Sequence, residues 1–141
     1  MVKGERLVYL GLTAQHLLKK YVQKKFRKAN ISITPSHTGI LFSLEKNGPQ
    51  SMNDLSELLF VKNSTITGLI DRLEKNNLVK RNSIGNDRRK WHITITDKGI
   101  DEINKAKKII KSINDEIKAG HSQSEIEGMQ AVLKGFFKKF Q

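Results

Sequence analysis

The feature that most constrains the fold is a pair of short amphipathic stretches followed by a β-rich segment. Residues 51–59 and 63–76 carry apolar side chains at the three- and four-residue spacing of a helix, and a short turn separates them. Two helices joined in this way predict a helix-turn-helix. Residues 78–81 and 91–96 are rich in β-forming residues, and the turn sequence Gly85-Asn86-Asp87 lies between them. This arrangement predicts a β-hairpin directly after the helices.

Long helical patterns flank this central part of the chain. Apolar spacing predicts a helix over residues 5–29, a shorter one over 36–46, and two more over 97–119 and 123–140, the first of these two capped by Asp97. The expected fold class is therefore mainly α with a small β-wing. A winged helix-turn-helix is flanked by long N-terminal and C-terminal helices.

The charge of the chain points to a polyanionic partner. Lys and Arg number 26 against 14 Asp and Glu, which gives a net charge of +12. The net charge is +7 over residues 1–30 and +4 over residues 63–96. The second group falls on a helix and a hairpin whose geometry suits a duplex. We therefore expect double-stranded DNA as the partner and no membrane, with the first group acting mainly through long-range attraction.

The second helix of the helix-turn-helix leaves a polar face free. With Ile66, Ile70 and Leu73 directed inward, small polar side chains near its start point outward. A major groove admits one helix, whose N-terminal residues meet the base edges. The candidate DNA-binding residues of this recognition helix are Asn63, Ser64, Thr65, Thr67, Gly68 and Arg72.

The predicted hairpin supplies a second group of candidates. Arg88, Arg89 and Lys90 lie at or just past its tip, where they reach phosphates or a narrow minor groove. Asp87 would be repelled by DNA, so we expect it to orient the wing by pairing with Arg72 or Arg89.

Ser36 and His37, at the start of the 36–46 helix, are candidate phosphate contacts. The alternative for His37 is a partly exposed residue at a helix start. Trp91 could stack on a base, but at the start of a strand we expect it to pack against the domain.

Enzyme and metal functions find little support in the sequence. No two histidines have the i, i+4 spacing of a helical ligand pair, and cysteine is absent, so we expect no metal and no cofactor. There is no phosphate-binding loop, nucleophile elbow or zinc-protease helix. No apolar run spans a membrane and no signal peptide opens the chain. A non-enzymatic cytoplasmic protein is expected.

Residues 51–99 resemble the MarR (multiple antibiotic resistance regulator) family of winged-helix transcription factors, and the flanking layout extends the resemblance over nearly the whole chain. The segments that carry it are Asn63–Lys75, Leu78-Val79-Lys80-Arg81, Asp87-Arg88-Arg89 and Ile95-Thr96-Asp97-Lys98-Gly99. Two positions depart from the family pattern. Lys62 stands where a capping Ser, Thr or Asp is usual, so Asn63 or Ser64 would cap instead. Gly68 stands where a larger, often basic, side chain is common.

The resemblance implies a homodimeric regulator, expected to be a repressor, that grips a pseudo-palindromic operator. Residues 1–34 and 98–141 would form the helical dimerisation region, and residues 35–97 the DNA-binding region. The family layout also implies a small amphipathic or phenolic ligand in a cleft between the two regions. The residues expected near that cleft are Leu12, His16, Leu17 and Leu41.

Two other functions remain open from the sequence. The charge alone would support an architectural protein that binds DNA without sequence preference. A winged helix can also serve protein contact, with the basic residues docking an acidic partner.

Overall fold

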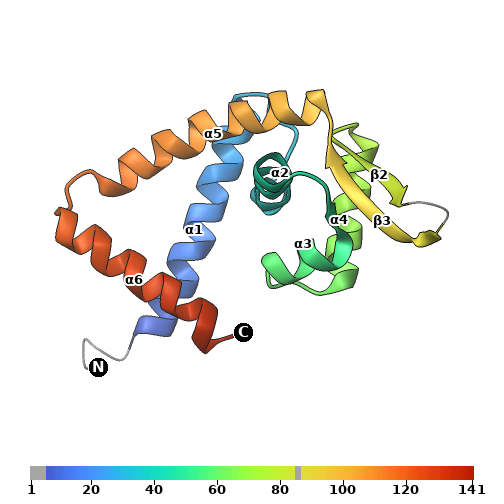
Figure 1. Ribbon diagram of the computed structural model, residues 1–141. Coiled ribbons are helices and arrows are strands. Elements are labelled where there is room, and N and C mark those ends of the chain that lie inside the picture. Colours follow the sequence, from blue (N-terminus) through green and yellow to red (C-terminus); the bar gives the residue numbers. More distant parts are fainter. Residues whose placement is uncertain (1–5, 85–86) are drawn as a thin grey trace. The chain divides into compact units, whose positions relative to one another are not determined.

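The computed structural model describes residues 6–84 and 87–141, apart from the side chains of residues 84–90 (Figure 1). The predicted fold class is confirmed: helices dominate, and a small antiparallel sheet follows the helix-turn-helix. The described elements are α1 (Leu7–Lys28), α2 (Pro35–Asn47), β1 (Gln50–Ser51), α3 (Met52–Leu58), α4 (Asn63–Lys75), β2 (Val79–Ile84), β3 (Asp87–Ile95), α5 (Asp97–Lys118) and α6 (Gln123–Lys139).

The wing is larger than the sequence pattern indicates. Strands β2 and β3 pair antiparallel, and β1 adds to the other edge of β3 to give the order β1-β3-β2. The pattern predicts strands over 78–81 and 91–96 only, and no β1. Ladder bonds need only backbone groups, so polar residues such as Asn82 join a strand once their partners across the hairpin are in register.

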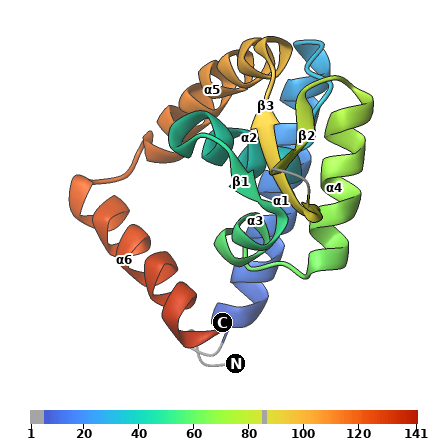
Figure 2. The same cartoon turned by 45° about the vertical axis from the view of Figure 1, so that its right-hand side comes forward.

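The chain divides into two compact units, of which the first ends at Ile109 and the second begins at Ile110. Within the first unit, α3 and β2 both contact α4, and Figure 2 shows α4 beside the hairpin. The fully buried apolar side chains of this unit come from every helix and from the sheet. They are Phe26, Ile40, Leu41, Leu44, Leu55, Ile66, Ile70, Leu73, Leu78, Val79, Ile93, Ile103 and Ala106. The division of the chain into dimerisation and DNA-binding regions remains a prediction.

Helix α5 begins one residue away from the expected cap. Asp97 is its first helical residue, and the Thr96 hydroxyl accepts a hydrogen bond from the Gly99 N–H at 3.0 Å. The expectation that Asp97 caps the helix is therefore wrong. Threonine fills the cap position because its side-chain oxygen can reach a backbone donor of the first turn.

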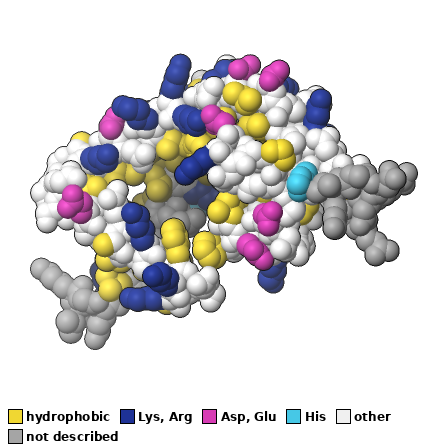
Figure 3. All heavy atoms as spheres, viewed as in Figure 1, with side chains coloured by type: hydrophobic (Ala, Val, Ile, Leu, Met, Phe, Trp, Pro, Cys, Tyr) yellow, Lys and Arg dark blue, Asp and Glu magenta, His cyan; other side chains and the backbone are white. Residues whose placement is uncertain are grey.

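The first half of α5 is tied to the winged helix by two polar contacts. Lys107 Nζ lies 2.7 Å from Glu45 Oε1 on α2, and Glu102 Oε1 accepts a hydrogen bond from the Ser32 N–H at 2.8 Å. Figure 3 shows acidic and basic side chains interspersed along this helix. The sequence pattern predicts exposed ion pairs for the acids of α5, but Glu102 is buried.

Helix α6 has a firm start and an uncovered apolar side. Ser122 and Glu125 form a reciprocal capping box at its N-terminus. No residue of the helix is buried, and its apolar side chains are exposed, namely Met129, Val132, Leu133, Phe136, Phe137 and Phe140. The first half of α1 carries a similar exposed set that includes Leu7, Val8 and Leu10.

None of the described helices has the length and hydropathy required to cross a membrane.

Candidate nucleic-acid interface

Helix α4 presents the face that the sequence pattern predicts. Ile66, Ile70 and Leu73 are buried against the first unit. All six predicted recognition-helix residues, Asn63, Ser64, Thr65, Thr67, Gly68 and Arg72, are exposed. The space around Gly68 is open, because a side chain built there would meet no atom within 4 Å. The N-terminal half of α4 is therefore free to approach another molecule closely.

The start of α4 leaves its first backbone donors without a side-chain cap. Lys62 occupies the cap position and forms no capping hydrogen bond, and neither Asn63 nor Ser64 takes that role. The expectation that one of them caps the helix is wrong, since both are already helical. The Thr67 hydroxyl donates to the Asn63 carbonyl at 2.9 Å, so its oxygen can still accept a hydrogen bond and its methyl group stays exposed.

A salt bridge that the sequence pattern does not predict joins the recognition helix to the wing. The Arg81 guanidinium on β2 binds the Asp71 carboxylate on α4, and its Nε lies 3.8 Å from Glu74 Oε2. The bridge neutralises a carboxylate on the exposed side of α4. It also fixes the direction in which the hairpin leaves the helix. No spacing rule within one element would find this pair, because the two residues meet only through the fold.

The wing candidates lie where only the backbone is described. Asp87, Arg88, Arg89 and Lys90 form the first part of β3 rather than a loop. Their side chains lie outside the described residues, as does the predicted turn at 85–86, so the orienting role of Asp87 stays a prediction. Trp91, expected to pack against the domain, is instead exposed over 39% of its surface.

The start of α2 corrects one of the two phosphate candidates. Ser36 is exposed, whereas His37 is only 3% exposed. The Thr34 N–H donates to His37 Nδ1 at 3.1 Å, so the ring closes the first turn of α2. The expectation of a partly exposed histidine that touches phosphate is therefore wrong, because the ring is enclosed by the domain.

The buried ring of His37 has an unusual electrostatic setting. Its Nε2 has no hydrogen-bond partner among the described residues. Burial lowers the pKa of His37 below its ordinary value, and the positive charge of Arg72 on α4 lowers this pKa further. The ring is therefore held neutral, and it links the start of α2 electrostatically to the recognition helix.

The predicted ligand cleft is not where the structure is hollowed. Leu41 is completely buried in the core, while Leu12, His16 and Leu17 are exposed on α1. Leu41 cannot line an open cleft, because α2 turns it into the centre of the first unit. The described part of the chain holds no group of three His, Asp or Glu side chains that could bind a metal.

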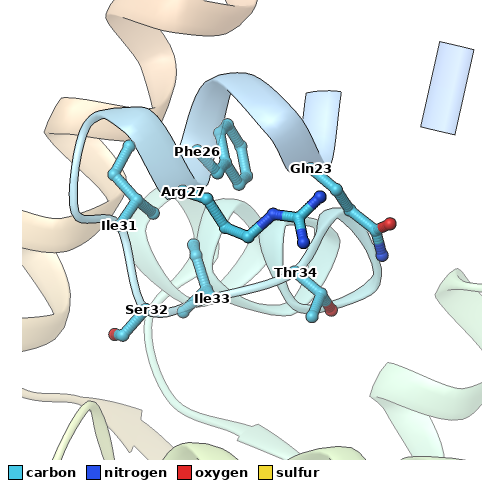
Figure 4. Close-up of a pocket in the computed structure, with 7 residues that line it drawn as sticks. All are labelled: Gln23, Phe26, Arg27, Ile31, Ser32, Ile33 and Thr34. Carbon is cyan, nitrogen blue, oxygen red and sulfur yellow. The ribbon is translucent and has the colours of Figure 1, made fainter. Parts of the chain in front are cut away.

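A cavity of about 250 Å³ lies instead at the junction of α1 and α2 (Figure 4). Phe26, Ile31 and Ile33 are buried and form an apolar floor. The Arg27 guanidinium is directed toward Gln23 and Thr34. No acidic side chain lines the cavity, whose residues are Gln23, Phe26, Arg27, Ile31, Ser32, Ile33 and Thr34. The site combines a positive charge with an apolar surface.

Comparison with known families identifies the central part of the chain. Residues 33–91 match the model of the MarR family. The transcriptional repressor MdtR of Bacillus subtilis is 37% identical over 67 residues, which cover 48% of this chain and 43% of MdtR. The transcriptional regulator SarZ of Staphylococcus epidermidis is 27% identical over 126 residues, which cover 88% of this chain and 84% of SarZ. The match to MdtR thus spans less than half of that protein.

Solved structures confirm the fold over nearly the whole chain. The S. aureus MepR–DNA complex has a TM-score of 0.85 and 23% identity, with 96% of this chain and 98% of that one covered. Bordetella bronchiseptica BpsR, whose DNA binding is regulated by 6-hydroxynicotinic acid, has a TM-score of 0.85 and 20% identity, with 96% of each chain covered.

Proposed function

Since the chain belongs to the MarR family through the domain at residues 33–91, we propose that it is a transcriptional regulator that binds a specific DNA sequence. The observation that carries this proposal is the exposed N-terminal face of α4, where Asn63, Ser64 and Thr65 point away from the buried Ile66 and Ile70. A basic wing follows the helix, so one protomer offers contacts to bases and to phosphates. Repression is the proposed outcome, as MdtR is a repressor.

A second copy of the chain is the proposed cover for the exposed apolar residues of α1 and α6. Apolar patches of this kind mark protein interfaces. Two recognition helices would then enter successive major grooves about 34 Å apart on a pseudo-palindromic operator. The regulator would act in the cytoplasm, where chromosomal DNA is accessible, and no catalytic step is part of the proposal.

The wing and the recognition helix should fail differently when mutated. We expect Arg89→Ala to weaken binding to every duplex and to reduce the salt dependence of affinity, because a lost phosphate contact releases fewer counterions. Thr67→Ala should instead lower the preference for operator over random DNA, since it removes a base contact. The measurement is a fluorescence-anisotropy titration at several salt concentrations, with an operator selected from a random-sequence pool.

Two outcomes of this titration would contradict the assignments. An unchanged salt slope in Arg89→Ala removes the wing from the mechanism. An equal loss of operator and random-DNA affinity in Thr67→Ala removes its base contact. The wild-type titration also tests the alternatives, because a regulator should prefer its operator by at least about 10³-fold. Equal binding to all duplexes favours an architectural protein, and no binding at low salt favours protein contact.

The α1–α2 cavity is the proposed site of the modulating ligand. An apolar floor and the Arg27 guanidinium suit a small amphipathic anion, and the volume is slightly below the range of about 300–1,000 Å³ typical of drug-sized ligands. Thr34 lines this cavity and also donates its N–H to His37, whose ring is influenced by Arg72 on α4. A ligand that shifts the start of α2 would therefore change the surroundings of the recognition helix.

Amide NMR spectra test this site directly with benzoate and its neutral analogue benzyl alcohol. We expect millimolar benzoate to shift the Thr34 backbone amide and the Gln23 side-chain amide, and benzyl alcohol to shift them far less. Arg27→Gln should abolish the benzoate shifts, because the charge that holds the carboxylate is gone. Lys24→Gln is the matched control, since Lys24 is a neighbouring charge on α1 outside the cavity. Equal shifts in the wild type and Arg27→Gln would exclude the cavity.

A further inference from the structure

The turn that leads into the recognition helix contains a strained aromatic residue. Phe60 lies between α3 and α4 with a φ of 55°, and 57% of its surface is exposed. The Phe60 N–H donates to the Glu57 carbonyl at 3.3 Å, and the Val61 N–H donates to the Ser56 carbonyl at 3.1 Å. These two bonds form a Schellman motif in which Phe60 takes the left-handed position that glycine usually fills.

Phenylalanine is poorly suited to this backbone position. A side chain with a Cβ atom is strained at positive φ, whereas glycine adopts the same conformation freely. The other described non-glycine residues with positive φ are Asn30 and Asn77, and asparagine tolerates this region. Phe60 is therefore the outlier among the described residues, and the fold itself would be served at least as well by glycine.

Burial does not explain the choice of phenylalanine. The turn is anchored by its neighbours, since Leu59 is half-buried and its side chain fills the space beside Gly39. Val61 is half-buried as well. Most of the Phe60 side chain instead faces outward. Strained residues that persist in this way cluster at functional sites.

The position of Phe60 indicates what the ring contacts. Lys62 is the cap residue of α4 and Asn63 its first helical residue, so Phe60 immediately precedes the end of α4 that is proposed to enter the major groove (Figure 2). Apolar side chains read DNA by contact with the methyl group of thymine.

We propose that Phe60 is a specificity-determining residue that contacts a thymine methyl group at the edge of the major groove. This inference rests on the proposed DNA-binding function. It adds to the polar face of α4 an apolar contact from outside the helix, and it explains why a strained, exposed phenylalanine stands where glycine would fit.

The test combines a variant with a modified duplex. Phe60→Gly should keep or raise the thermal midpoint, since strain is removed, yet lower the affinity for a duplex selected by the wild-type protein about tenfold per dimer. Replacing thymines by deoxyuridine, one at a time, should reveal a position where the wild type loses affinity and Phe60→Gly loses none. Asn77→Gly is the matched control, because it relieves another left-handed residue at the far end of α4 and should leave affinity unchanged.

Each other result overturns the inference. Unchanged affinity in Phe60→Gly shows that the ring does not touch DNA. A lowered thermal midpoint shows that the residue serves the fold. Equal sensitivity of both proteins to every deoxyuridine substitution shows that no thymine methyl group is read by Phe60. If the wild-type protein enriches no sequence from the pool, the proposed function fails first, and the inference fails with it.

Discussion

Replacing Gly99 by alanine is expected to destabilise the first unit by more than about 3 kcal/mol, which is at or above the usual cost of overpacking a core. A Cβ atom at this position would lie 2.2 Å from the Leu78 carbonyl oxygen and 2.7 Å from Ile95 Cγ1. The Leu78 carbonyl also accepts a hydrogen bond from the Thr96 N–H at 3.0 Å. The clash is with a bonded backbone group, so no side-chain rotation relieves it.

Urea unfolding followed by circular dichroism measures this loss, and Gly68→Ala is the matched control. Gly68 lies inside α4 with open space around it, so alanine should stabilise the helix there by up to about 1 kcal/mol. The two glycine-to-alanine changes should thus have opposite signs. A Gly99→Ala protein as stable as the wild type would mean that α5 can leave the wing at little cost.

Gly99 illustrates what the sequence can and cannot give. Its place in the segment Ile95–Gly99 contributes to the resemblance to the MarR family, but the sequence does not say why glycine stands there. The reason is a close approach between α5 and the chain at Leu78, two segments separated by the whole wing. Periodicity predicts the helices and the exposed face of α4 because those features depend on local spacing.

Features that depend on distant segments were predicted less well. His37 and Glu102 are polar residues on helices, and local pattern predicts that they face solvent, yet both are buried. Each has a backbone partner in the segment between α1 and α2, namely the Thr34 and Ser32 N–H groups. Tertiary structure supplies these donors, so no single-element pattern reveals them. The Arg81–Asp71 bridge escaped prediction for the same reason.

Replacing Phe136 by lysine is expected to convert the protein to a monomer and to lower operator affinity by at least about 10²-fold. Phe136 lies with Met129, Leu133 and Phe140 on one side of α6, and all four are exposed in the single chain. A charge at the centre of this stripe would have to be buried without a partner when two copies associate. Once the protomers separate, the second half-site no longer binds as an intramolecular event, and an avidity of about 10²–10⁴ is lost.

Ala131→Lys is the control that separates association from electrostatics. Ala131 is exposed on the opposite side of α6, and both variants add one positive charge. Added charge alone strengthens attraction to DNA, so a loss of affinity in Phe136→Lys cannot come from charge. Light scattering after size-exclusion chromatography should give the mass of one chain for Phe136→Lys and of two for Ala131→Lys. A dimeric Phe136→Lys protein would show that another surface joins the protomers, and the exposed residues of α1 would then be the next to test.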